Sequence, residues 1–105
     1  MDNRIIDLLN KIKEKPGFYI GRKSLLDLWH FLNGYQYRLF ELEGEYYNLS
    51  GFQEYIENLY NFHGVHSWAQ IIHFYCITDE AAFDKFYKHL DDFFKEMNLN
   101  SESET

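Results

Sequence analysis

The chain has 105 residues, is 20% aromatic and carries a formal net charge of −7. Its length suits one domain with one hydrophobic core, and its acidic balance argues against nucleic acid or an anionic membrane as a partner. No apolar run approaches the roughly 18 residues of a membrane span, and the lone Cys76 excludes an internal disulfide.

The first predicted helix covers residues 2–14, where isoleucine and leucine recur at helical spacing. Pro16-Gly17 ends it, because proline disfavours helical backbone at the residue before it. We expect residues 18–21 to form a short extended or irregular link.

A second, longer helix is predicted to begin at Ser24, with its side chain as N-cap and Asp27 at the third helical position. We expect it to continue through Gly34 and to stop near Gly44. Its predicted inner face consists of Leu25, Leu28, Trp29, Leu32, Tyr35 and Leu39.

Two capping boxes predict the next two helices, because a Ser at the N-cap and a Gln three residues later satisfy each other's backbone amides. The first box is Ser50 with Gln53, and the second is Ser67 with Gln70. A turn at 63–66 separates them. The residues expected to face inward are Phe52, Tyr55, Ile56, Leu59 and Tyr60 in the first helix, and Trp68, Ile71, Ile72 and Tyr75 in the second.

The last predicted helix starts near 78–80, where two acids suit the positive helix N-terminus. Its apolar stripe is Phe83, Phe86, Tyr87, Leu90, Phe93, Phe94 and Met97. Residues 98–105 are polar and are expected to form a frayed tail. The sequence therefore predicts an all-α protein, with a single compact domain of about five helices over 1–97.

Charge is unevenly distributed along the chain. Residues 1–23 hold six bases and three acids, whereas residues 24–105 hold four bases and fourteen acids. From Leu39 to Asp84 there is no Lys or Arg among eight carboxylates and eleven aromatic rings. Such a one-signed stretch attracts a cationic partner, although it is also consistent with a solvated acidic surface over an aromatic core.

The candidate interface is the part of this stretch that we do not expect to be buried in the core. We expect Tyr46 and Tyr47 to lie in a loop among acids, since exposed tyrosines often anchor protein interfaces. Glu54 and Glu57 fall on one outward face of a helix. The candidate partner-binding residues are Glu41, Glu43, Glu45, Tyr46, Tyr47, Glu54 and Glu57.

No residue set predicts chemistry. His63 with His66, and His73 with Cys76, have spacings seen in metal sites, but a glycine turn and aromatic neighbours favour surface or packing roles. Cys76 lies in an apolar run and is expected to be buried and unreactive, which fits a reducing compartment, the cytoplasm. We therefore predict no catalytic residue, no metal and no cofactor.

Several short motifs resemble those of small bacterial immunity proteins from contact-dependent and other polymorphic toxin systems. They are Lys15-Pro-Gly-Phe-Tyr-Ile-Gly21 followed by Ser24-Leu-Leu, then Phe31-Leu-Asn-Gly-Tyr35, Ser67-Trp-Ala-Gln-Ile-Ile72 and Phe83-x-x-Phe-Tyr-x-x-Leu-Asp91. The resemblance implies a protein without catalytic activity that binds one toxin domain, often a nuclease, and blocks it. The resemblance does not indicate which residues of this chain would contact the toxin.

Two hypotheses follow from the sequence. The first is an immunity protein whose acidic face covers the basic active site of a toxin, with a ribonuclease favoured because a nuclease groove must hold phosphates. The second is a helical adaptor or regulator that acts as a homodimer without a toxin. A contact between the basic N-terminal segment of one chain and the acidic stretch of another would also produce an oligomer.

Overall fold

The structure, a computed structural model, describes the backbone of residues 3–43 and 51–104, and the side chains of 5–42 and 51–97. The described residues form six α-helices and no strand. Five of these helices match the predicted ones, so the all-α prediction is confirmed. Their bounds are α1 Asn3–Glu14, α2 Pro16–Ile20, α3 Leu25–Glu43, α4 Phe52–Tyr60, α5 Trp68–Phe74 and α6 Asp79–Glu104.

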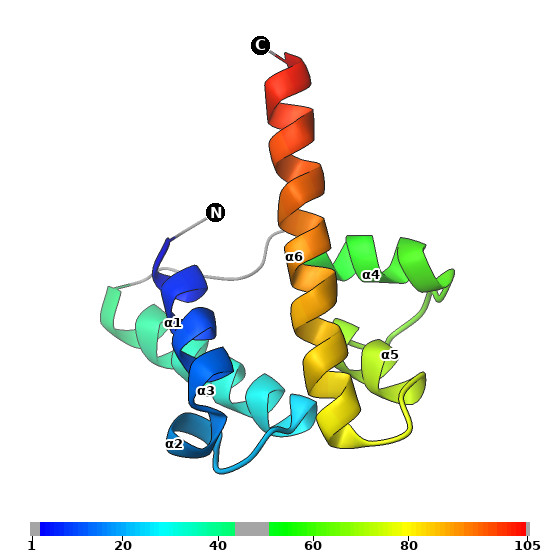
Figure 1. The fold of residues 1–105 in the computed structure, drawn as a ribbon. Helices are drawn as coiled ribbons and strands as arrows, with labels where there is room; N and C mark the ends of the chain where they lie inside the picture. Colours follow the sequence, from blue (N-terminus) through cyan, green and yellow to red (C-terminus); the bar gives the residue numbers. More distant parts are fainter. Residues whose placement is uncertain (1–2, 44–50, 105) are drawn as a thin grey trace.

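The long helix α6 organises the fold. It runs between α1–α3 on one side and α4–α5 on the other, and its C-terminal end extends beyond the other helices (Figure 1). Helices α3, α4 and α5 all pack directly against it. The polar residues 98–104, predicted as a tail, continue this helix as far as Glu104.

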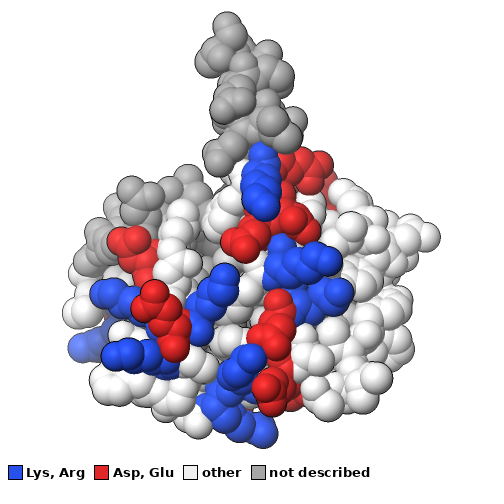
Figure 2. Space-filling model, viewed as in Figure 1, with Lys and Arg blue, Asp and Glu red and all other residues white. Residues whose placement is uncertain are grey.

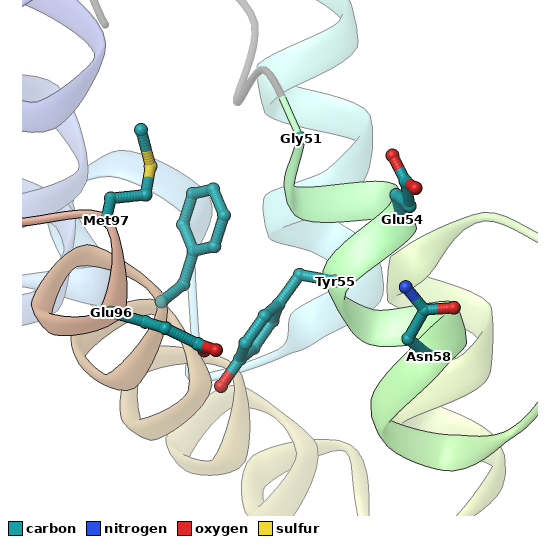
Figure 3. A pocket seen from close by; sticks show the side chains of 7 residues that line it. Gly51, Glu54, Tyr55, Asn58, Glu96 and Met97 are labelled. Carbon is teal, nitrogen blue, oxygen red and sulfur yellow. The ribbon is translucent and has the colours of Figure 1, made fainter. Parts of the chain in front are cut away.

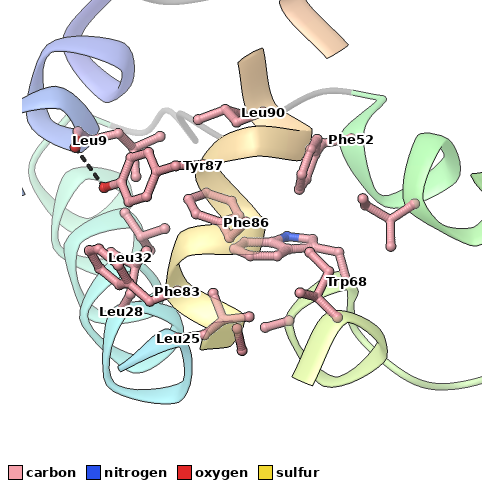
Figure 4. Packing of buried hydrophobic residues seen from close by; sticks show 14 of the residues in the cluster. Leu9, Leu25, Leu28, Leu32, Phe52, Trp68, Phe83, Phe86, Tyr87 and Leu90 are labelled. Atoms are coloured by element: carbon pink, nitrogen blue, oxygen red, sulfur yellow. Dashed lines mark hydrogen bonds between the residues drawn. The ribbon is translucent and has the colours of Figure 1, made fainter. Parts of the chain in front are cut away.

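The core is built where α6 meets its neighbours. The predicted stripe lies inside except for the half-buried Phe94 and the more exposed Met97. Phe86 stacks on Trp68 with ring centroids 4.8 Å apart, and Phe52 meets both rings edge-on (Figure 4). Such aromatic pairs add attraction beyond the area that they bury.

Tyr87 fastens α1 to α6. Its hydroxyl donates a hydrogen bond of 2.6 Å to the backbone carbonyl of Leu9, seen as the dashed line in Figure 4. Burial raises the pKa of Tyr87 well above its ordinary value, because the phenolate would be poorly solvated. The hydroxyl therefore stays protonated and available as the donor.

The predicted link at 18–21 is wrong, because residues 16–20 form the short helix α2. Pro16 occupies the first turn, where its fixed φ is compatible with a helix and its missing N–H has no intrahelical partner to lose. Gly21, with φ of +85°, then ends the helix. Phe18 is left 80% exposed on α2.

The capping prediction at Ser50 falls outside the described residues, and Gln53 does not act as a cap partner within α4. The N-cap position is Gly51, with no side-chain cap. The Gln53 amide instead accepts a hydrogen bond of 2.7 Å from the Trp68 backbone N–H and donates one of 2.9 Å to the His66 carbonyl. It thus joins α4 to the start of α5.

Other local predictions are confirmed. Both reciprocal hydrogen bonds of the Ser67–Gln70 capping box are present. Helix α3 continues through Gly34, which lies on an exposed face with open space around it. Two residues expected to face inward are exposed instead, namely Leu59 and Tyr75. Leu59 lies near the end of α4, and Tyr75 directly follows α5.

The start of α3 is capped from two directions. Ser24 accepts a hydrogen bond from the Asp27 backbone N–H at 3.1 Å, which confirms its predicted N-cap role. The Asp79 carboxylate accepts a hydrogen bond from the Ser24 hydroxyl. It also accepts hydrogen bonds from the backbone N–H groups of Leu25 at 3.1 Å and Leu26 at 3.3 Å. Asp79 therefore places a negative charge at the positive N-terminus of α3, and it is also the first residue of α6.

Replacing Asp79 with Ala should lower the free energy of unfolding by about 1.5–3 kcal/mol, because the orphan amides of α3 lose a charged acceptor. Urea unfolding would measure the loss. Glu80→Ala is the matched control: Glu80 occupies the next helical position but is exposed and pairs with Lys23 at 3.7 Å. Exposed pairs contribute under about 1 kcal/mol, so equal losses in the two variants would contradict the capping role of Asp79.

Candidate protein-binding site

A pocket of about 220 Å³ opens between α4 and the C-terminal half of α6 (Figure 3). Tyr55 reaches from α4 toward Glu96 on α6, and Glu54 and Asn58 lie on the α4 side. Among the described residues, the lining contains two carboxylates and no Lys or Arg. The lining residues are Gly51, Glu54, Tyr55, Asn58, Phe93, Glu96 and Met97.

Packing at the start of α4 fixes this geometry. Gly51 has φ of +87°, and a Cβ there would lie 3.7 Å from the Phe93 ring, so the chain enters α4 directly over α6. The next residue, Phe52, is fully buried, and its ring lies 5.4 Å from that of Phe93. Tyr55, one turn later, packs on the same Phe93 ring at 5.3 Å. The pocket therefore has an aromatic floor held by the core.

The pocket is electronegative. The pKa of Tyr55 is raised, first by burial and then by the nearby carboxylates of Glu96 and Asp92. Those negative charges disfavour the phenolate and would favour a cation at the same place. Met97 lines the mouth with a flexible apolar side chain that adapts its shape to a partner.

Among the predicted interface residues whose side chains the structure describes, Glu54 alone lines this pocket. Glu57 is half-buried on the next turn of α4 and does not line it, and Glu41 is exposed on α3. Glu43 ends α3, but its side chain lies outside the described part. The remaining predicted residues, Glu45, Tyr46 and Tyr47, also lie outside the described residues.

Sequence reasoning missed the residues that complete the pocket. Glu96 lies three residues after Phe93 and directly before Met97, so the edge of the apolar stripe could have pointed to it. Tyr55 is predicted to face inward, and it is half-buried and forms one wall of the pocket. That Glu96 of α6 and Glu54 of α4 line the same pocket follows from tertiary packing alone.

The basic end of the chain is partly neutralised within the fold. Lys23 pairs with Asp84 at 2.8 Å, and this hydrogen bond is the main reason that its pKa is raised. Arg22 pairs with Asp27 at 3.0 Å. Figure 2 shows Lys and Arg interspersed with Asp and Glu on this face, which is therefore not a uniform basic surface.

The surroundings of Cys76 and His73 favour structural roles for both side chains. Cys76 is half-buried rather than buried, and burial raises the pKa of its thiol, so the reactive thiolate is disfavoured. His73 Nε2 lies 3.7 Å from the Asp79 carboxylate. The described residues contain no group of three His, Cys, Asp or Glu side chains arranged to hold a metal ion.

The chain matches no protein-family model, no curated protein and no solved structure. Within the described residues, none of the helices has both the length and the apolar character that crossing a membrane requires. Its functional interpretation therefore rests on its own residues and on the motifs noted above.

Proposed function

We propose that this chain is an immunity protein, without catalytic activity, that binds and neutralises a basic toxin domain. The observation that carries this proposal is the pocket between α4 and α6, which combines an aromatic floor with the carboxylates of Glu54 and Glu96. The resemblance of its short motifs to bacterial immunity proteins supports the same function.

The pocket has the chemistry to receive a Lys or Arg side chain. The hydrocarbon stem would pack on Tyr55, Phe93 and Met97, since long basic side chains bury their stems while their heads stay polar. The cationic head would lie between Glu54 and Glu96, where charge-assisted hydrogen bonds are stronger than neutral ones. An aromatic ring beside the cation adds a further attraction.

A nuclease is the toxin class that best fits this charge pattern. Its substrate groove must be basic to hold phosphates, so an acidic protein can occupy the groove in place of the nucleic acid. Complementary charge also speeds association, which matters for a protein that must reach a toxin before it acts. We propose a ribonuclease bound in the cytoplasm as the most direct case.

Co-expression tests this function. The chain is produced together with the product of the neighbouring gene, and growth and co-purification are scored. The expected result is that the gene product is toxic alone, that the chain restores growth, and that the two proteins co-purify. A harmless neighbour, or a toxic one that the chain neither rescues nor binds, contradicts the proposal.

A further inference from the structure

A second surface, separate from the acidic pocket, has no charge of its own. Between Glu57 and Asp79 the sequence contains no Asp, Glu, Lys or Arg. This segment forms the end of α4, all of α5 and the turns on either side. On the face that Figure 2 shows, the right-hand side of the molecule is free of Lys, Arg, Asp and Glu among the described residues.

Large apolar side chains are exposed together on this surface. Ile77 is 100% exposed, Val65 97% and Phe74 72%. We call this surface the aromatic face and define it by Leu59, Phe62, Val65, Phe74, Tyr75 and Ile77. Monomeric proteins rarely leave such residues contiguous in solvent, whereas interfaces contain them regularly.

Ring contacts hold the aromatic side chains of this face against one another. Tyr75 stacks on Tyr60 at 4.9 Å and meets Phe62 edge-on at 6.4 Å, and Phe62 also lies 6.2 Å from Phe74. Behind them the Tyr60 hydroxyl lies 2.7 Å from His89 Nε2. Burial lowers the pKa of His89, which keeps the support of the face uncharged.

The aromatic face contains a hollow as well as projections. A pocket of about 270 Å³ is lined by Phe62, His66, Gln70, Ile71 and Phe74. Val65 directly precedes one of these lining residues, and Ile77 follows Phe74 by three residues. A patch that holds both a hollow and projecting apolar side chains can be complementary to itself, which a twofold-symmetric interface requires.

Charge indicates which kind of binding partner the aromatic face favours. Two copies of a chain with net charge −7 repel each other overall, and like charges placed opposite each other are costly. The aromatic face lets two copies meet without opposing carboxylates. A basic partner, in contrast, gains nothing here from charge and is drawn to Glu54 and Glu96.

We propose that two copies of the chain associate through the aromatic face to form a twofold-symmetric dimer. Projecting residues such as Ile77 or Val65 of one copy fill the hollow between Phe62 and Phe74 of the other. The interface shares no residue with the lining of the acidic pocket. The dimer therefore offers two acidic pockets, and its existence does not depend on the proposed function.

Sedimentation velocity over a series of concentrations tests the dimer. The wild-type chain should show a concentration-dependent monomer–dimer equilibrium. Ile77→Glu and Phe74→Glu should each weaken it at least about 100-fold, because each substitution would bury an unpaired carboxylate in the apolar hollow at the interface. Both residues are largely exposed, so the fold of each variant should be kept, which circular dichroism would verify.

Phe18→Glu is the matched control, since it adds the same charge at an equally exposed aromatic residue on α2. It should leave the dimer unchanged. A wild-type chain that stays monomeric overturns the proposal, and so does a dimer that persists in both variants. A monomer whose affinity for a co-purified toxin falls in Phe74→Glu would overturn it as well and would assign the face to the toxin.

Discussion

Phe86→Ala should lower the free energy of unfolding by about 3–5 kcal/mol, a large part of the ~5–15 kcal/mol typical of a domain. Phe86 is fully buried at the centre of the fold. Its ring stacks on Trp68 of α5 and meets Phe52 of α4 edge-on. Truncation therefore removes apolar contact with two helices at once and leaves a cavity between them.

The effect should appear as a lower midpoint in urea unfolding and as a fall in melting temperature of more than about 10 °C. Phe86→Leu should lower the free energy of unfolding clearly less, because it leaves a smaller cavity. Phe18→Ala is the control, since that ring is mostly exposed on α2 and its removal should change stability little. Similar losses at Phe18 and Phe86 would contradict the assignment of the core.

The features of the fold that the sequence predicts correctly are those that depend on neighbouring residues. The apolar stripe of α6 and the caps at Ser24 and Ser67 involve residues within a few positions of each other, so periodicity and capping rules apply directly. Pro16 misled the prediction, because a proline that ends one helix can equally well begin the next. At this position it begins α2.

Contacts between distant segments were not predictable in the same way. Asp79 has a sufficient local reason at the start of α6, yet its carboxylate also caps α3, with Ser24 55 residues away. Gln53 likewise fits a local capping box, but its amide bonds to the backbone at 66–68. In each case a polar side chain has several satisfactory partners, and only the packing of the helices selects among them.

The same limit applies to the candidate site. The one-signed charge of 39–84 pointed to Glu54, because an outward carboxylate can be recognised from helical spacing. The second carboxylate, Glu96, lies outside that stretch, in a part of α6 where acids and lysines alternate. The edge of the apolar stripe points to Glu96, but it points equally to Asp91 beside Leu90 and to Asp92 beside Phe93. Only the packing of α4 against α6 places Glu96, and neither Asp, in the lining of the pocket.

If the proposed function is right, reversing both pocket carboxylates, with Glu54→Lys and Glu96→Lys, should weaken binding of the proposed toxin by about 1,000-fold. A cationic side chain of the toxin would then meet two ammonium groups in place of two carboxylates, and like charges at an interface cost several kcal/mol. Association should also become slower and less dependent on salt, because the attractive local field is lost. Stopped-flow and equilibrium binding at several salt concentrations measure both effects.

The control for this variant changes the net charge equally but away from the pocket. Asp7→Lys with Glu14→Lys reverses two exposed acids of α1, and each pair of reversals takes the net charge from −7 to −3. If the pocket receives the toxin, the α1 variant should bind with nearly wild-type affinity. Equal weakening in both variants would mean that only the overall charge matters.

Neutral substitutions separate the pocket's charge from its shape. Glu54→Gln with Glu96→Gln keeps hydrogen-bonding groups and volume while it removes both charges, so binding should fall less than in the Lys variant. Tyr55→Leu keeps an apolar wall but removes the ring on which a cation would pack, and it should cost a further factor of about 5. If all of these variants bind like the wild type, the toxin does not use the α4–α6 pocket.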